Sequence, residues 1–145
     1  MQLRRILVPT DFSEFALAAV EAAASMAAAS GGRLTLQHVH PIVEVVVLEY
    51  SYVQPPERVA EALDAARSRL VAMAAKLDLP TERIDIMVTT GQPAHEIIAA
   101  SKAHDLVVMP THGRTGLSHF MLGSVAERVV QGAACSVLVV KTPRP

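Results

Sequence analysis

Short apolar runs that alternate with helix-like segments constrain the fold of this chain more than any other feature. Five such runs, rich in valine, leucine or isoleucine, are "ILV" (6–8), "LTLQHV" (34–39), "IDIMVTT" (84–90), "DLVVM" (105–109) and "SVLVV" (136–140). Runs of this kind are typical of strands buried on both faces of a parallel sheet. Between them, four segments with helical periodicity cover residues 13–30, 55–80, 91–104 and 123–133. The alternation predicts a Rossmann-like α/β fold, in which an open five-stranded parallel sheet has helices on both faces, in three layers.

The expected strand order also predicts where a ligand binds. Right-handed crossovers between five strands make 3-2-1-4-5 the simplest order. The winding then reverses between the first and fourth strands, and ligands of such sheets bind outside the carboxyl ends of the strands at this reversal. The loops that follow these two strands, "VPTD" (8–11) and "MPTH" (109–112), are similar to each other. We therefore expect them to face each other across one crevice.

Two further segments carry structural predictions. Asp11 and Glu14 form a possible capping pair at the start of the first helix, and two glycines at 31–32 end that helix. The segment "PIVEVVVLEYSYVQPP" (41–56) is too long for a tight turn and too apolar for a solvated loop. Two interpretations stay open: an excursion that covers the crevice or a partner subunit, or an extra helical turn or edge strand packed on the core.

Length and composition narrow the class of protein. The 145 residues fit a single domain over 1–145, and 13 basic against 14 acidic residues give a net charge of −1. Because no basic face or tail stands out, we expect no nucleic-acid partner. No apolar stretch is long enough to span a membrane, and the one cysteine, Cys135, fits a reducing compartment. We expect a soluble cytoplasmic protein.

The stretch "MPTHGRTGLSHFMLGSVAERV" (109–129) contains the strongest chemical pattern. Gly113 and Gly123 let backbone N–H groups approach an anion, Ser124 adds a hydroxyl at a helix N-terminus, and Arg114 can screen phosphates. The structural alternative is that Gly113 supplies a positive φ and Ser124 caps a helix. Asp11 has two compatible roles, since it can cap the first helix and also accept hydrogen bonds from adenine or ribose.

Other reactive side chains give weaker indications. His38, His40 and His112 could share a metal ion, but no cysteine or acidic partner has a familiar spacing, so ordinary polar contacts are favoured. His95 and His104 are expected on helix surfaces. Cys135 is expected to be a small buried side chain, and no serine has a nucleophile-elbow pattern, which leaves hydrolase chemistry unsupported.

Taken together, "ILVPTDFSEFALAAVEAA", "LQHVH", "GQPAHEII" and the stretch from Met109 to Lys141 resemble the universal stress protein family. The resemblance runs from Leu3 to Lys141 and is weakest at 41–56. Nucleotide-binding members carry G-x2-G-x9-G-[S/T], and Gly113, Gly123 and Ser124 match its second half. The resemblance implies that this loop holds ribose and phosphates, while Asp11 and Val39 hold adenine. Pro110 replaces the first glycine, so one N–H donor is missing there.

The resulting prediction is a regulatory protein that binds ATP or another adenine nucleotide, with or without Mg, and hydrolyses it slowly at most. The expected site consists of Pro9, Thr10, Asp11, Val39, Met109, Pro110, His112, Gly113, Arg114, Gly123, Ser124 and Val125. The resemblance also implies a homodimer, and pairing of the apolar edge from Ser136 to Lys141 with its copy would protect that edge. The alternative is a dimeric interaction module that binds no nucleotide, and a nucleotidyltransferase has the least support.

Overall fold

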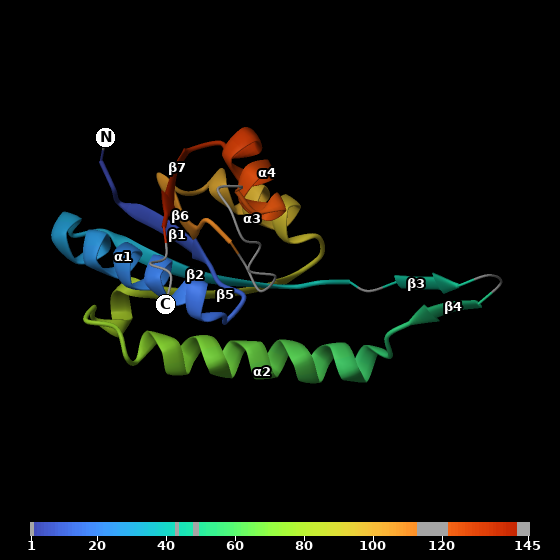
Figure 1. Cartoon of the computed structure of the whole chain (residues 1–145). Coiled ribbons are helices and arrows are strands. Elements are labelled where there is room, and N and C mark those ends of the chain that lie inside the picture. The colour runs from blue at the N-terminus through green and yellow to red at the C-terminus, as the bar shows by residue number, and fades with distance from the viewer. Residues whose placement is uncertain (1, 43, 48–49, 113–121, 142–145) are drawn as a thin grey trace.

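The computed structural model describes residues 2–42, 44–47, 50–112 and 122–141 (Figure 1). The strands are β1 (Arg5–Pro9), β2 (Arg33–His40), β3 (Glu44–Val47), β4 (Tyr50–Val53), β5 (Ile84–Thr90), β6 (Leu106–Pro110) and β7 (Ser136–Val140). The helices are α1 (Glu14–Ser30), α2 (Pro56–Ala74), α3 (Pro93–Ser101) and α4 (Ser124–Gly132), with a 3₁₀ turn, η1 (Thr81–Arg83), before β5.

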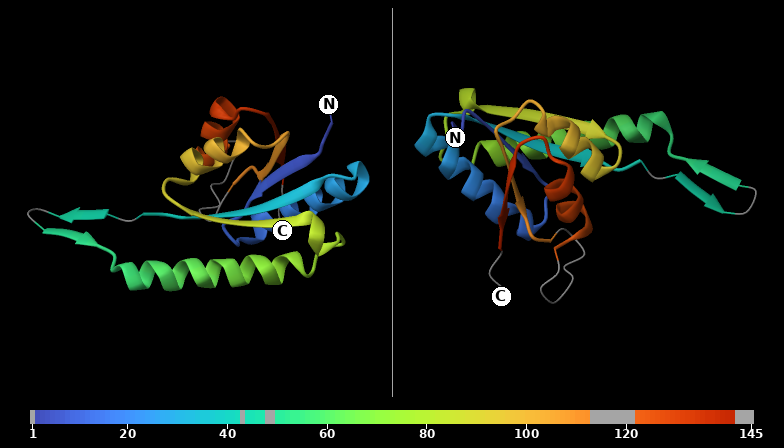
Figure 2. Two further views of the ribbon diagram at one scale, coloured as in Figure 1. Left: turned by 180° about the vertical axis from the view of Figure 1, so that it is seen from behind. Right: turned by 90° about the horizontal axis from the view of Figure 1, so that it is seen from above.

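The main sheet has the predicted topology. Its five strands run parallel in the order β5-β2-β1-β6-β7. Without the inserted strands β3 and β4, this is 3-2-1-4-5, so the predicted order is confirmed. Helices α1 and α2 cover one face and α3 and α4 the other, as two views show (Figures 1 and 2). The three predicted layers are therefore also confirmed.

The central strand β1 explains why the apolar runs contain so few polar residues. Ile6 and Val8 pack into the cluster beneath α1 and α2, whereas Leu7 packs into the cluster beneath α3 and α4. Because successive side chains point to opposite faces, a strand covered on both sides must be apolar throughout.

Helix α1 begins with a cap that differs from the predicted one. Its N-cap is Ser13, whose hydroxyl oxygen accepts a hydrogen bond from the N–H of Ala16 at 3.3 Å. The predicted Asp11–Glu14 capping pair is thus wrong. Asp11 does not cap the helix itself but supports the N-cap residue, because its Oδ1 accepts a hydrogen bond from the Ser13 N–H at 2.9 Å. At the other end Gly31 has φ 72°, a left-handed conformation that favours glycine, and its N–H bonds to a carbonyl of the last turn.

Helix α2 is shorter than predicted. It ends at Ala74 rather than near 80, because Leu79 is buried in the core and the chain turns inward to place it there. Arg83 then donates to the carbonyl oxygens of Ala27 and Gly32 and ties the start of β5 to the end of α1. In the part of the chain that the structure describes, neither α2 nor another helix is long and apolar enough to cross a membrane.

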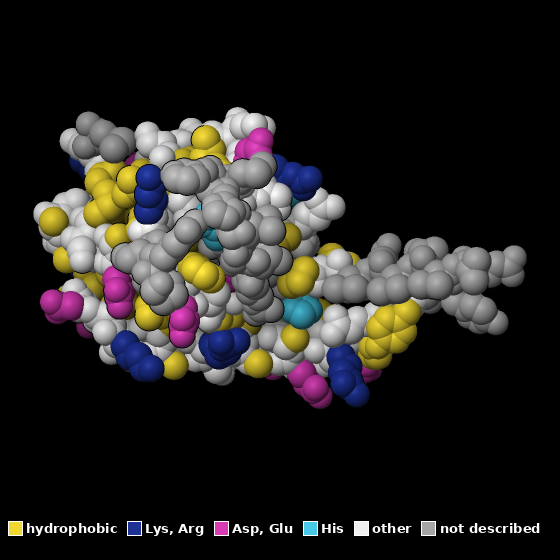
Figure 3. All heavy atoms as spheres, in the orientation of Figure 1, with side chains coloured by type: hydrophobic (Ala, Val, Ile, Leu, Met, Phe, Trp, Pro, Cys, Tyr) yellow, Lys and Arg dark blue, Asp and Glu magenta, His cyan; other side chains and the backbone are white. Residues whose placement is uncertain are grey.

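Segment 41–56 forms an arm that consists of β3 and β4. The two strands pair antiparallel in a sheet of their own and project beyond the main body (Figures 1 and 2). Tyr52 and Val53 are 61% and 66% exposed, and apolar side chains are visible where the arm meets α2 (Figure 3). The interpretation as an extra helical turn or edge strand packed on the core is wrong, since the described residues of β3 and β4 pair with each other and not with the main sheet. That the arm covers the crevice or a partner subunit stays a prediction.

Candidate functional site

A cavity of about 330 Å³ lies at the carboxyl ends of β1, β2 and β6, where the winding of the sheet reverses. This volume is at the lower end of the range for small-molecule sites, roughly 300 to 1,000 Å³. The structure brings ten of the predicted site residues together around it: Pro9, Thr10, Asp11, Val39, Met109, Pro110, His112, Gly123, Ser124 and Val125. Gly113 and Arg114 lie outside the described residues. That these residues bind a nucleotide stays a prediction.

The corner after β1 is held by a set of local bonds. Thr10 donates its N–H to the carbonyl oxygen of Gln37 on β2 at 2.8 Å, which extends the sheet by one residue. His38 Nδ1 lies 2.9 Å from the Thr10 carbonyl oxygen, and since that oxygen only accepts, Nδ1 carries the proton. Phe12 has φ 64°, a conformation that is unusual for a residue with a side chain. The corner is therefore a constrained turn with a fixed shape.

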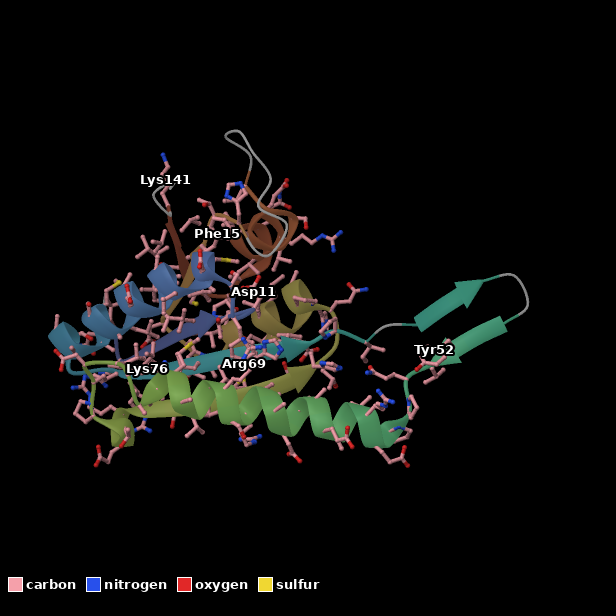
Figure 4. The ribbon with its side chains drawn as sticks, turned by 60° about the horizontal axis from the view of Figure 1, so that its bottom comes forward. Asp11, Phe15, Tyr52, Arg69, Lys76 and Lys141 are labelled. Carbon is pink, nitrogen blue, oxygen red and sulfur yellow. The ribbon has the colours of Figure 1, made fainter. Side chains whose placement is uncertain are left out.

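Aromatic and cationic contacts stabilise this turn from the α2 side. The ring of Phe12 stacks on that of His38 with centroids 4.5 Å apart, and the guanidinium carbon of Arg69 lies 3.9 Å from the Phe12 centroid. Figure 4 shows Arg69 on α2 in the region of the corner that carries Asp11. Stacking and cation–π contacts of this kind offset the cost of the positive φ. The carboxylate of Asp11 is consequently presented from a rigid corner.

The corner after β6 has a different construction. The Thr111 N–H bonds to the Val140 carbonyl oxygen on β7 at 3.1 Å, and the Gly123 N–H bonds to the Thr111 carbonyl oxygen at 2.8 Å. The second bond brings the start of α4 beside the end of β6. His112 follows Thr111 at this corner, and its Nδ1 lies 3.1 Å from the Thr111 hydroxyl oxygen. Its Nε2 is buried and has no hydrogen-bond partner among the described residues.

Helix α4 starts at this corner with an open N-terminus. The N-cap is Gly123, and no side chain of the described residues caps the helix. The alternative that Ser124 is a helix cap is therefore wrong, because Ser124 is the first helical residue. Ser124, Val125 and Ala126 all line the cavity. N–H groups of a first turn have no partner within the helix, and the helix dipole there favours negative charge.

Strand β2 lies on the side of β1 away from β6, and at its end it has backbone groups that pair with no described strand on the β1 side. Its pairing with β1 stops at Gln37, whose carbonyl oxygen points toward β1, while Val39 pairs only with β5. Residues two apart on a strand point their N–H and C=O groups to the same side. The N–H and C=O of Val39 therefore face the crevice where β1 has ended.

The other histidines that the sequence analysis named have structural contacts and form no metal site among the described residues. Among the described residues, no three His, Cys, Asp or Glu side chains are grouped so that they could hold a metal ion. His95 is an exposed helix residue beside Glu96, as predicted. His104 is not: Nδ1 contacts the Ala100 carbonyl oxygen and Nε2 the Thr35 hydroxyl, so it links α3 to β2.

The cysteine is also less enclosed than predicted. Cys135 is half-buried rather than buried. Burial raises the pKa of its thiol, and the nearby charge of Asp105 raises the pKa further. The thiolate, which is the nucleophilic form, is thereby disfavoured.

Sequence reasoning missed several residues of the cavity wall. Ala16, Pro93, Ile97, Thr111 and Ala126 contribute small or apolar surface, and Gln37 contributes an amide. Only Gln37 had a signal, as the one amide inside the otherwise apolar run "LTLQHV". A polar side chain in a doubly covered strand either bonds to its surroundings or meets a ligand.

Comparisons with known proteins agree with this fold. The model of the universal stress protein family matches residues 2–141. Universal stress protein MJ0531 of Methanocaldococcus jannaschii is 36% identical over 145 residues, which cover 97% of this chain and 84% of the relative. The solved structure of MJ0577, a hypothetical protein, has a TM-score of 0.79 at 24% identity and covers all of both chains.

Two further structures were solved with adenine nucleotides. A universal stress protein in complex with cAMP has a TM-score of 0.73 at 21% identity, over 99% of this chain and all of the other. One from Archaeoglobus fulgidus in complex with dAMP has a TM-score of 0.66 at 21% identity, over 97% of this chain and all of the other. At this level of identity the likeness establishes the shared fold.

Proposed function

Because the chain belongs to the universal stress protein family, we propose that it is a regulatory protein that binds ATP or another adenine nucleotide in the cavity between its two corners. One observation supports this most strongly. Among the described residues, one cavity combines a helix N-terminus without a side-chain cap on the β6 side with strand backbone that pairs with no neighbouring strand on the β2 side.

The α4 side suits the phosphates. The first-turn N–H groups at Ser124 and Val125 have no side-chain cap from the described residues, and the exposed Ser124 hydroxyl lies beside them. Such an N-terminus binds phosphate through its N–H groups and its dipole together. Gly113 and Arg114, from the same stretch of sequence, are proposed to complete this subsite.

The β2 side suits the adenine. An adenine edge presents the N6 amino group as donor beside a ring nitrogen as acceptor, and the Val39 C=O and N–H offer the complementary pair. Apolar surface from Val39, Pro93 and Ile97 can cover the flat ring. Asp11, which also lines the cavity, is proposed to accept hydrogen bonds from ribose or adenine.

Two solved relatives contain ligands that fit this arrangement. The proteins with bound cAMP and dAMP have different sugars and phosphates but share adenine and one phosphate group. These are the two parts for which the cavity of the present chain offers separate surfaces.

The cavity favours binding over catalysis. Among the described residues that line it, Asp11 is the one charged side chain. A carboxylate alone neither clamps a transferring phosphoryl group nor neutralises its developing charge. We therefore propose a nucleotide sensor in the cytoplasm, with slow ATP hydrolysis at most.

A homodimer through β7 is part of the proposal. β7 is the edge of the sheet and pairs with β6 on one side, and Leu138 at its middle is 39% exposed. An apolar edge strand is an aggregation hazard unless it is paired, and a two-fold axis pairs it with its own copy. Analytical ultracentrifugation should give a dimer, and Leu138→Lys should shift it toward monomer. A monomeric wild-type protein would contradict the dimer.

Calorimetry tests the nucleotide site. We expect ATP to bind with a Kd in the micromolar range, about −8 kcal/mol, in titrations with and without Mg²⁺. Mass spectrometry of small molecules released from the freshly purified protein provides a second readout.

Adenosine and inorganic triphosphate serve as controls, because each carries half of the ligand. We expect each to bind at least about tenfold more weakly than ATP, since each uses one side of the cavity. If ATP, ADP and AMP release no heat and no nucleotide co-purifies, the dimeric interaction module without a nucleotide replaces this proposal.

A further inference from the structure

Gln37 is the most enclosed polar side chain of the cavity wall. It is 0% exposed at the middle of β2, and it lines the cavity beside Val39 and Ile97. A wholly buried amide is uncommon in a strand that helices cover on both faces. We propose that Gln37 is a specificity-determining residue, whose Oε1 accepts a hydrogen bond from the amino group of the bound base.

The surroundings of the amide fix which end is left for a ligand. Nε2 lies 3.4 Å from the Glu96 carbonyl oxygen and 3.5 Å from the Thr89 hydroxyl oxygen. A flipped amide would bring Oε1 against the Glu96 carbonyl, so that two acceptors would face each other. The donor end of Gln37 is thus turned toward protein acceptors, and the acceptor end remains.

Oε1 has no partner within the described part of the chain. It is buried from water and accepts no hydrogen bond there. A buried acceptor without a donor is destabilising, and an apolar residue of similar size would avoid that cost. The two bonds of Nε2 are at the long limit for hydrogen bonds, and the terminal torsion angle of a glutamine side chain varies over a broad range. A small rotation of the amide that turns Oε1 toward a ligand therefore loses little hydrogen-bond energy at Nε2.

The ligand group that satisfies Oε1 must be a donor. This step rests on the proposed function, which places the base on the β2 side. The adenine amino group has two hydrogens, so one can bond to the Val39 carbonyl and the second to Gln37. A base without an amino group leaves Oε1 unsatisfied, and a site built around a hydrogen bond rejects such analogues strongly.

Purine riboside 5′-triphosphate tests this inference, because it differs from ATP only in lacking the amino group. Calorimetry on the full-length protein should show that ATP binds at least about tenfold more tightly than this analogue. In Gln37→Leu, ATP affinity should fall about tenfold while the affinity for the analogue stays within about twofold. The ratio of the two affinities should therefore fall about tenfold, and the preference that remains comes from the hydrogen bond to the Val39 carbonyl.

Thr35→Val is the matched control. Thr35 is also buried on β2, two residues before Gln37, but it bonds to His104 and does not line the cavity. It should lose stability and keep the wild-type ratio of affinities. Circular dichroism melting should show Gln37→Leu to be folded and at least as stable as wild type.

Two results overturn the inference and differ in what they imply. An unchanged affinity ratio in Gln37→Leu, with ATP still bound, removes the role of Gln37 and leaves the nucleotide site intact. Absence of binding of both triphosphates to the wild-type protein refutes the proposed function, and the role of Gln37 with it.

Discussion

Helices α1 and α4 both begin at the cavity, yet their N-termini differ. At α1 the Ser13 hydroxyl accepts from the Ala16 N–H, and Asp11 in turn holds Ser13 through its N–H and hydroxyl. At α4 the N-cap is Gly123, which has no side chain to offer. One helix is therefore capped by its own side chain at the Ala16 N–H, whereas no side chain of the described residues caps the first turn of the other.

This difference indicates which end of the cavity is better suited to an anion. Both helices have the same dipole, so position alone does not distinguish them. A negative capping group nearby does, because the carboxylate of Asp11 repels a second anion at the start of α1. The open start of α4 is the complementary case, which an anionic ligand can occupy.

The largest expected effect comes from making α4 resemble α1. Gly123→Asp should lower ATP affinity about a hundredfold, because a carboxylate at the N-cap occupies the first-turn N–H groups and repels phosphate. Gly123 has φ −59°, which aspartate adopts without strain, so the melting temperature should stay equal or rise. Calorimetry and thermal melts measure the two effects.

Gly123→Asn is the control for charge. Asparagine caps a helix about as well as aspartate but carries no charge. Its affinity for ATP should lie between those of wild type and Gly123→Asp. Equal ATP affinities in all three proteins would mean that α4 does not hold the phosphates.

A smaller effect is expected when the closed corner is disrupted. Asp11→Ala should lower ATP affinity about tenfold and stability by about 1 kcal/mol, because it removes both a ligand contact and the support of Ser13. Ser13→Ala removes only the cap, so it should cost similar stability with little loss of affinity. If Asp11→Ala lowers the melting temperature and leaves affinity unchanged, Asp11 has a structural role alone.

The smallest effect concerns the proline at the open corner. Pro110→Gly should strengthen ATP binding about threefold, because it restores an N–H where the family pattern has glycine. Stability should fall by about 0.5–1 kcal/mol, since glycine gives the unfolded chain more freedom. Weaker binding in this variant, measured by the same calorimetry, would show that the proline ring itself contacts the ligand.

The sequence predicted those features that follow from periodicity and chain order. The apolar runs defined the five strands of the main sheet, and the chirality of crossovers then placed the "VPTD" and "MPTH" corners at one crevice. Ten of the expected site residues consequently lie around one cavity. These predictions require knowledge of two things alone: which face of each element is buried, and which strand ends lie close together.

Features that depend on individual hydrogen bonds were not predictable in this way. Asp11 and Ser13 are both good capping residues, and only the backbone turn at Phe12 decides that Ser13 is the cap. The end of α2 depends on the burial of Leu79 in the core, which is a tertiary contact. Segment 41–56 alternates too little to distinguish an arm from a packed strand. That Gln37 Oε1 lacks a donor among the described residues depends on tertiary contacts, because Glu96 and Thr89 contact Nε2 from other elements of the fold.

In the proposed complex, the open N-terminus of α4, and not the closed one of α1, holds the phosphate of the adenine nucleotide. Backbone amide shifts in ¹⁵N-labelled protein, followed by NMR during titration with AMP and separately with adenosine, test it most directly. The amide signals of Ser124 and Val125 should shift strongly with AMP and little with adenosine, while those of Glu14 and Ala16 should change less with either ligand. Phosphate-dependent shifts at the start of α1, with α4 unaffected, would contradict it.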